Sequence, residues 1–268
     1  MNNPGTLTDG KRYLANTYRR APLLLVKGQG CQVWDIEGKE YLDFVAGIAV
    51  NNLGHCHPRV VEAIQQQAAR LIHVSNLYYI QPQIELARLL VNNSFADKAI
   101  FCNSGAEAIE AAIKLARRYS VEHFGPDRFE IICMDHSFHG RTMGALSATG
   151  QIKYHQGYQP MLPGFSFVPY NDLDALRKAI TDKTCAILVE PIQGEGGVNV
   201  PKDSYLPGLR EICQKYKLLL IYDEIQTGMG RTGKLFAYEH YGSPPDVMAL
   251  AKGIAGGVPM GVLLATGE

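Results

Sequence analysis

From residue 98 onward, short apolar runs alternate with longer segments of helical periodicity, and this alternation restricts the fold more than any other feature. Strands joined by helical crossovers form parallel sheets that are covered on both faces. We therefore predict an α/β fold with a mostly parallel sheet. The expected strands are KAIFC (98–102), FEIICM (129–134), FSFVPY (165–170), TCAILVE (184–190), KLLLIYD (217–223) and DVMALA (246–251), and the expected helices between them are 106–119, 173–180 and 205–216.

The first 57 residues have a different pattern. Apolar and polar residues alternate on both sides of Glu37-Gly38, which predicts a hairpin with a two-residue turn. A helix is expected over 58–72, with Pro58 in its first turn, and another over 83–92. We expect residues 1–57 to form an N-terminal segment and residues 58–268 to form the large domain.

The composition is that of a globular protein and excludes several classes of partner. The chain has 268 residues, 46% hydrophobic and 19% charged, and its 26 Lys+Arg balance its 26 Asp+Glu. The net charge is zero, so it does not favour binding to nucleic acid or to an anionic membrane. No apolar run approaches the ~20 residues that span a bilayer. The N-terminus lacks the apolar segment of a secretory signal, so we expect a cytoplasmic protein. Six cysteines are scattered without a C-x-x-C pair, which predicts reduced, mostly buried thiols and no zinc site.

Polar residues follow three of the expected strands. Asn103 and Ser104 come after AIFC, Glu190 after AILV, and Asp223 with Glu224 after LLLIY. Ligands of α/β proteins bind at the carboxyl ends of parallel strands. Burying an unpaired carboxylate is costly, so either the chain reaches the surface at Asp223 or a cation binds there. Three polar strand ends at one sheet edge favour a ligand-binding site over a simple surface position.

An alternative interpretation is a nucleotide-binding loop. The segment GMGRTGK (228–234) matches G-x-x-x-x-G-K, and the strand before it resembles one that carries carboxylates for Mg²⁺. Leu235 stands where such a loop needs Ser or Thr, and the segment follows that strand instead of preceding it. Both departures argue against a nucleotide hydrolase.

The start of the helix after KAIFC is a better anion site. Ser104 is placed as an N-cap, and Glu107 would complete a capping box. Gly105 and Ala106 lack bulk, so their N–H groups can approach a phosphate at the positive end of the helix dipole. A well-capped helix with no ligand would show the same pattern, and this segment alone does not separate the two.

A phosphorylated cofactor at that helix, with a cationic ring atom near Asp223, would be pyridoxal 5′-phosphate. Its ring nitrogen is stabilised by a carboxylate and its aldehyde is held by a lysine. Lys252 ends the strand DVMALA and is followed by glycines. Partial burial there would lower its pKa and make it nucleophilic, although a lysine at a strand end is often only a surface residue.

Five motifs resemble one enzyme family and lie in the same order along the chain. They are SGAEA (104–108), SFHGRT (137–142), EPIQGEGG (190–197), YDEIQTGMGRTG (222–233) and LAKGIAGGVPMG (250–261). The chain resembles, over essentially its whole length, the class III, fold-type I pyridoxal-phosphate aminotransferases. The resemblance implies that residues 1–57 belong to a small domain, whose C-terminal part lies beyond this chain.

The resemblance assigns the cofactor contacts. It implies that Lys252 holds the cofactor's aldehyde and moves the proton between substrate and cofactor, and that Asp223 pairs with the pyridine nitrogen. The residues implied to surround the cofactor are Ser104, Gly105 and Ala106 at the phosphate, Phe138 and Ile225 on the two ring faces, Gln226 at the phenolic oxygen, and Glu224. Only one of two neighbouring carboxylates can point at the ring, because side chains on a strand alternate, and the resemblance favours Asp223.

The resemblance also assigns substrate contacts. It implies that Arg141 binds the substrate's carboxylate through its planar, bidentate fork, and that Glu195 pairs with a substrate-binding arginine which this chain lacks. Glu190 would support the site without touching the cofactor. His136 and His139 lack cysteines or carboxylates at ligand spacing, so we expect no metal.

The implied activity is transamination from N2-acetylornithine to 2-oxoglutarate, a step of arginine biosynthesis, by a chain that forms a homodimer at full length. Ornithine, succinylornithine, succinyldiaminopimelate and 4-aminobutyrate are alternative donors within the same family. The last fits least well, because Arg141 favours a substrate with a free α-carboxylate. Proteins of this family are about half as long again, so a non-catalytic remnant is the alternative of a different class.

Overall fold

The computed structural model describes residues 6–267, and contacts divide the chain into two compact units at Val74/Ser75. The division lies later than the boundary expected at 57/58, because the helix that follows residue 57 groups with the first unit. The first unit contains α1 (Thr6–Tyr13), β1 (Leu25–Gln29), β2 (Gln32–Asp35), β3 (Glu40–Leu42), α2 (Ala46–Ala49) and α3 (Pro58–Ala68). Its strands form a three-stranded antiparallel sheet in the order β1-β2-β3.

The hairpin expected around Gly38 is present, but the prediction of a two-residue turn was wrong. The Asp35 N–H donates to the Lys39 carbonyl at 3.0 Å, so three residues form the loop. The Gly38 N–H donates to the Asp35 carbonyl at 3.0 Å, and Gly38 has φ +81°. A turn followed by one left-handed residue is the usual three-residue hairpin loop, and glycine takes that conformation without strain.

The second unit begins at Ser75 and contains every motif that the sequence singled out for the site. Its helices are α4 (Gln81–Asn92), α5 (Gly105–Phe124), α6 (Met143–Ser147), α7 (Leu173–Ala179) and α8 (Tyr205–Tyr216). Its strands are β4 (Lys98–Cys102), β5 (Glu130–Met134), β6 (Phe165–Val168), β7 (Thr184–Val189), β8 (Leu219–Asp223), β9 (Val247–Leu250) and β10 (Gly261–Ala265). Short 3₁₀ turns are η1 (Ile152–Tyr154), η2 (Ala237–His240) and η3 (Lys252–Ala255).

These strands form one sheet in the order β4-β10-β9-β8-β7-β5-β6. β5 to β9 run parallel to one another, whereas β10 is antiparallel to both of its neighbours, β9 and β4. The prediction of an α/β fold with a mostly parallel sheet is therefore confirmed. Because β10 reverses, β4 points the same way as β9, and the carboxyl ends of β4 to β9 share one edge.

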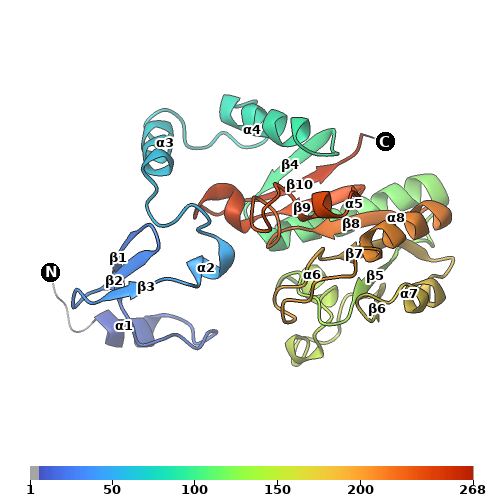
Figure 1. Ribbon diagram of the computed structural model, residues 1–268, viewed down its shortest axis with the longest axis horizontal. Coiled ribbons are helices and arrows are strands. Elements are labelled where there is room, and N and C mark those ends of the chain that lie inside the picture. Colours follow the sequence, from blue (N-terminus) through green and yellow to red (C-terminus); the bar gives the residue numbers. More distant parts are fainter. Residues whose placement is uncertain (1–5, 268) are drawn as a thin grey trace. The chain divides into compact units, whose positions relative to one another are not determined.

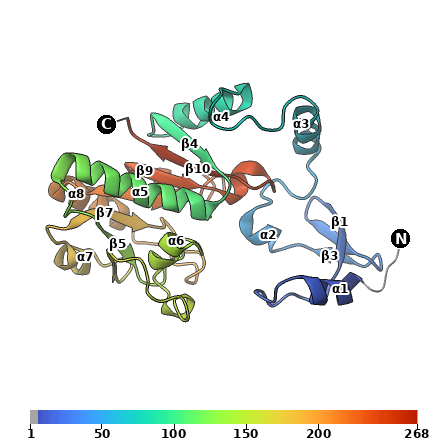
Figure 2. The same cartoon turned by 180° about the vertical axis from the view of Figure 1, so that it is seen from behind.

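Helices cover both faces of this sheet, which is why its strands are apolar on both sides. Along β5, Ile132 and Met134 pack with the cluster that includes residues of α4, α7 and α8, while Ile131 and Cys133 pack with residues of α5 and α6. Figure 1 shows α7 and α8 in front of the sheet, and Figure 2, from behind, shows α5 crossing the other face.

The expectation that the cysteines are mostly buried holds only in part. Three are buried in the core of the second unit and Cys102 is half-buried, but Cys31 and Cys56 are exposed. Both exposed thiols lie in the first unit, whose small sheet has little core to bury them. No helix within residues 6–267 is long and apolar enough to cross a membrane.

Candidate functional site

The polar residues that follow the strands meet at one edge of the large sheet. β7, β8 and β9 are parallel neighbours. Asp223 is the last residue of β8, and Glu190 and Lys252 follow the ends of β7 and β9, so all three lie at adjacent carboxyl ends. The start of β10 reaches the same edge. A Cβ on Gly261 would lie 2.1 Å from the Ser104 carbonyl oxygen, so only glycine allows this approach.

The N-terminus of α5 presents free N–H groups at this edge. The Ser104 hydroxyl accepts from the Glu107 N–H at 3.2 Å. The Glu107 carboxylate accepts from the Asn103 N–H at 2.5 Å, one residue earlier than the expected capping box. Within residues 6–267 the N–H groups of Gly105 and Ala106 have no hydrogen-bond acceptor, which leaves two donors at the positive end of a 20-residue helix.

Close packing requires glycine at position 105. A Cβ there would lie 2.9 Å from Cδ1 of Ile225 and 3.3 Å from Cβ of Ala251. Gly140, at φ +136°, fits against the other side of the helix start, where a Cβ would lie 3.0 Å from Cβ of Ala106. Small residues therefore let three loops converge on the first turn of α5.

The Asp223 carboxylate forms the centre of a buried polar cluster. Its Oδ2 lies 2.7 Å from Nδ1 of His139, and both side chains are almost fully buried. Its Oδ1 accepts from the Ile225 N–H at 3.0 Å. The other ring nitrogen of His139, Nε2, is buried and has no hydrogen-bond partner among the described residues. The carboxylate is thus fixed in orientation while it retains lone pairs for a further donor.

Glu190 borders this cluster. Its Oε2 accepts from the Phe138 N–H at 3.1 Å, which ties the SFHGRT loop to the end of β7. Burial raises the pKa of Glu190 to about 7; His139 opposes the shift and Asp223 adds to it. Glu190 therefore keeps its proton up to a higher pH than an exposed glutamate does.

Lys252 is partly buried and adopts a strained backbone conformation. Its φ is +49°, in the left-handed region that costs a non-glycine residue about 1–2 kcal/mol. Burial lowers the pKa of Lys252, and the charges of Asp223, Glu195 and Glu190 partly oppose the shift. The amine is therefore more easily deprotonated than a surface lysine and lies within the field of the carboxylates at this edge.

The two carboxylates after β8 have separate surroundings. Glu224 accepts from the N–H groups of Ala237 at 2.6 Å and Tyr238 at 2.9 Å, and from the Thr227 hydroxyl at 3.1 Å. Those donors belong to the start of η2 and to the preceding turn. Glu224 therefore anchors the segment after β8, and Asp223 alone joins the His139 cluster.

Phe138 and Arg141 lie together in the loop after β5. Phe138 is half-buried and packs edge-on to Tyr154, with ring centroids 5.8 Å apart. The Arg141 guanidinium lies 4.8 Å from the Tyr154 ring centroid and 5.7 Å from that of Phe138. No carboxylate among residues 6–267 forms an ion pair with Arg141.

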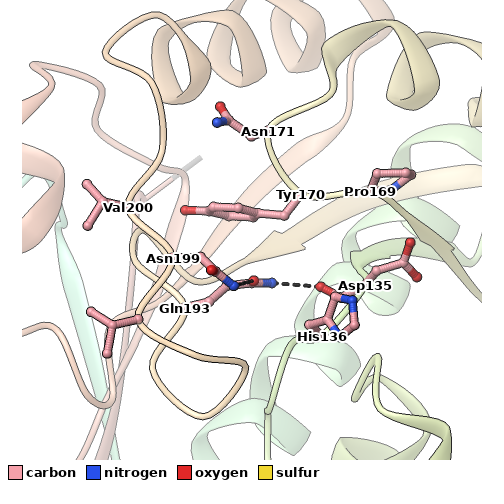
Figure 3. Close-up of a pocket in the computed structure, with 9 residues that line it drawn as sticks. Asp135, His136, Pro169, Tyr170, Asn171, Gln193, Asn199 and Val200 are labelled. Carbon is pink, nitrogen blue, oxygen red and sulfur yellow. Dashed lines mark hydrogen bonds between the residues drawn. The ribbon is translucent and has the colours of Figure 1, made fainter.

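Glu195 is exposed at the tip of a short loop that is held from both sides. The buried Gln193 side chain donates to the Asp135 carbonyl at 2.8 Å and accepts from the Asn199 amide at 2.9 Å. Figure 3 shows Gln193 directed at the Asp135 backbone, beside a cleft of about 490 Å³ that the Tyr170 ring also lines.

Gln226 packs against the same loop. A Cβ on Gly194 would lie 1.7 Å from Oε1 of Gln226, so glycine is required at that position. The EPIQGEGG and YDEIQTG segments are therefore in direct contact, as their positions after β7 and β8 require.

Sequence reasoning missed four residues of this arrangement. His139 was considered only as a metal ligand, whereas the structure pairs it with Asp223. Glu110, which accepts from the Thr142 hydroxyl of the SFHGRT loop, was not singled out, and neither were Tyr154 and Gln193. Gln193 and His139 lie inside quoted motifs, but nothing local marks their partners. No group of three or more potential metal ligands occurs within residues 6–267.

Comparison with known proteins agrees with this geometry. The family model "Aminotransferase class-III" matches residues 13–268. The acetylornithine aminotransferase of Caldanaerobacter subterraneus is 59% identical over 259 residues, covering 97% of this chain and 66% of that protein. The enzyme of the same name from Methanocaldococcus jannaschii is 56% identical, covering 95% and 64%. The chain thus spans just under two thirds of the length of these curated relatives.

Solved structures show the same fold. The ornithine aminotransferase of Toxoplasma gondii superposes with a TM-score of 0.93 at 39% identity, covering 97% of this chain and 62% of that one. A further structure of that enzyme, with a TM-score of 0.91, is described as having partial occupancy of PLP at its active site. The acetylornithine aminotransferase of Elizabethkingia anophelis superposes with a TM-score of 0.84 at 36% identity, covering 97% and 63%. With the family model matching nearly the whole chain, and with the strand-end geometry described above, this chain belongs to the class-III aminotransferase family.

Proposed function

We propose that this chain binds pyridoxal 5′-phosphate at the carboxyl edge of the large sheet and belongs to an enzyme that transfers an amino group from N2-acetylornithine to 2-oxoglutarate. One observation carries the proposal above all: a buried, oriented carboxylate at position 223 and a pKa-lowered amine at position 252 flank the edge where two helix N–H groups are free. The amines named for its relatives supply the substrate class.

The residues present fit the cofactor. The free N–H groups of Gly105 and Ala106 suit its phosphate, and Ser104 holds the helix start in place. Asp223 retains lone pairs for a ring N–H. Phe138 and Ile225 supply apolar surface from two loops, and Gln226 supplies an amide. Glu224 already accepts hydrogen bonds from the N–H groups at the start of η2, so we do not propose that it contacts the cofactor.

When bound, the cofactor supplies an electron sink for the bond electrons released at the substrate carbon. Asp223, held by His139, keeps a proton on the ring nitrogen, because an ionised carboxylate favours the cationic form of its partner. Lys252 accepts and returns the proton at the substrate carbon that carries the amino group, and its lowered pKa favours the free amine that this role needs. Arg141 binds a substrate carboxylate, and Glu195 pairs with an arginine supplied from outside this chain.

Which amine is the donor remains part of the proposal. Relatives carry the names of enzymes for acetylornithine, for succinylornithine or acetylornithine, and for ornithine. We propose N2-acetylornithine because several similar curated proteins are named acetylornithine aminotransferase. Homodimer formation by the full-length protein and a cytoplasmic location are proposed on the same family ground.

The test begins with cofactor binding by this chain. Addition of pyridoxal 5′-phosphate should give a yellow species that borohydride fixes to Lys252, as located by mass spectrometry, and Lys252→Ala should give none. A panel of N2-acetylornithine, ornithine, succinylornithine, succinyldiaminopimelate and 4-aminobutyrate should then discharge the colour fastest with the first. A chain that stays colourless would instead favour a non-catalytic role.

A further inference from the structure

Arg141 is held over aromatic rings while its hydrogen-bonding groups stay available. The guanidinium lies 4.8 Å from the Tyr154 centroid, and no carboxylate within residues 6–267 pairs with it. A cation on an aromatic face is attracted through the ring quadrupole, which leaves the in-plane N–H fork free. This contact orients the arginine side chain and leaves its N–H groups free to donate to a carboxylate.

The backbone beside Arg141 is fixed by Glu110, on α5. One oxygen, Oε1 of Glu110, accepts from the Thr142 hydroxyl at 2.5 Å and from the N–H groups of Gly144 at 2.9 Å and Ala145 at 3.2 Å. A carboxylate on one helix thus satisfies free donors at the N-terminus of the next, α6. A Cβ on Gly144 would lie 2.4 Å from this carboxylate, so the absence of a side chain at position 144 makes room for Glu110.

Tyr154 is fixed just as firmly on the other side. It ends η1, and the next residue, His155, places Nε2 2.9 Å from the Leu146 carbonyl and 2.8 Å from that of Thr149. The ring also packs edge-on against Phe138. Lys153 adds a second cation 4.8 Å from the same ring centroid, which makes this corner electropositive.

We propose that Glu110 and Tyr154 are positioning residues that together orient Arg141 for a substrate carboxylate, Glu110 through the backbone and Tyr154 through the side chain. This inference rests on the proposed function, because it takes Arg141 as the carboxylate-binding residue. A free arginine side chain samples many rotamers, and ordering it on binding weakens affinity. A guanidinium that is already oriented avoids that loss of affinity. Removing either Glu110 or Tyr154 should therefore weaken carboxylate binding and leave phosphate binding unchanged.

The experiment measures binding of glutarate, a non-reacting dicarboxylate, to the chain saturated with pyridoxal 5′-phosphate, by calorimetry. Tyr154→Leu and Glu110→Ala should each raise the glutarate Kd about five- to tenfold, while the cofactor Kd stays within about twofold. Tyr154→Phe keeps the ring and Glu110→Gln keeps the accepting Oε1, so both should bind glutarate like the unsubstituted chain. Matched controls are Tyr158→Leu, an exposed tyrosine, and Glu122→Ala, at the far end of α5.

Amide hydrogen exchange supplies a readout that needs no ligand. Glu110→Ala should speed exchange at Gly144 and Ala145, and Glu110→Gln should not. Glutarate binding unchanged in both Tyr154→Leu and Glu110→Ala, but lost in Arg141→Ala, would overturn the inference and leave the proposed function intact. Failure of the proposed function would appear separately, as the missing Lys252 adduct in the unsubstituted chain.

Discussion

At the scale of single residues, the environment rather than the residue type separates the two carboxylates after β8. Asp223 faces a buried histidine, and Glu224 faces two backbone N–H groups and a hydroxyl. Asp223 belongs to the buried cluster at the sheet edge, and Glu224 stabilises the turn before η2. Neighbouring residues of one strand can thus have different tasks, because their side chains leave the strand on opposite sides.

Asp223→Ala should keep some cofactor but lose nearly all turnover. Without the carboxylate, the ring nitrogen of the proposed cofactor would not stay protonated, and the amine half-reaction should slow by roughly a hundredfold or more. The rate is read from the loss of cofactor colour after N2-acetylornithine is added. Glu224→Gln is the matched control and should lose far less. An unchanged rate in Asp223→Ala would count heavily against the assignment of the ring partner.

Glu190 should make stability depend on pH in a defined window. Burial raises its pKa from 4.5 to about 7 in the folded chain, so the folded state keeps a proton that the unfolded state releases. Its contribution is fully present below about pH 4.5 and is lost as pH rises through 7, a total of roughly 3 kcal/mol. Urea unfolding at pH 5 and pH 8 measures the difference.

Glu190→Gln should remove that part of the slope, and Glu122→Gln, a surface control on α5, should leave the slope as it was. Some slope will persist in Glu190→Gln, because burial also raises the pKa of Glu224 to about 7. A free energy of unfolding that falls equally with pH in Glu190→Gln and in the unsubstituted chain would show that Glu190 is ionised throughout.

At the scale of elements, α5 connects the anion site to the loop that carries Arg141. Its first turn presents Gly105 and Ala106, and a little over one turn later Glu110 caps α6. Its buried face packs alanines and isoleucines on the sheet, so the helix cannot shift without disturbing the core. The spacing between the two proposed ligand groups, phosphate and carboxylate, is therefore set by one rigid element.

Ser104→Ala should destabilise the chain and weaken cofactor binding together. Loss of the N-cap hydroxyl costs about 1 kcal/mol of unfolding free energy and loosens the first turn of α5. The matched control is Asp172→Ala, which removes the N-cap of α7, where the carboxylate accepts from Asp174 at 3.0 Å and Ala175 at 2.9 Å. Both variants should lose similar stability in urea, but only Ser104→Ala should raise the cofactor Kd. Equal cofactor affinity in the two variants would show that the first turn of α5 does not bind the cofactor phosphate.

At the scale of the whole molecule, the chain contains two compact units of different character. The second has a seven-stranded sheet with a core on each face, and the first has three short strands and many exposed apolar side chains, such as Phe44 at 89%. The segment after the division is also exposed: Leu77 at 84% and Tyr79 at 94%. Exposed apolar surface of this extent is typical of protein interaction sites.

Limited chymotrypsin treatment should cut first at Leu77, Tyr78 or Tyr79. These side chains suit the protease, and the segment around them lies between α3 and α4, outside any regular element. Mass spectrometry should find two fragments that meet there, with the second unit resistant to further cleavage. First cuts within the large sheet instead would contradict the division at Val74/Ser75.

The alternation of strand and helix patterns predicted six of the seven strands of the second unit, but it missed the antiparallel strand β10 and the short helix α6. KAIFC (98–102) and 205–216 match β4 and α8 at both ends, because a buried face leaves a periodic signal in the local sequence. The N-terminal hairpin was found but its loop was miscounted, since Gly38 fits both a two-residue and a three-residue turn until the partner strand sets the register.

The sequence alone therefore determined most of the elements, the polar residues that end the strands and the family resemblance. Each of these is written in consecutive residues or in quoted motifs. Only the tertiary structure decided that His139 pairs with Asp223, 84 residues later, that Glu110 caps α6, and that Tyr154 lies under Arg141. Such pairs join residues far apart in the chain, and their partners depend on how the strands are ordered in the sheet. Local periodicity carries no information about that order, because it reports only which face of an element is buried.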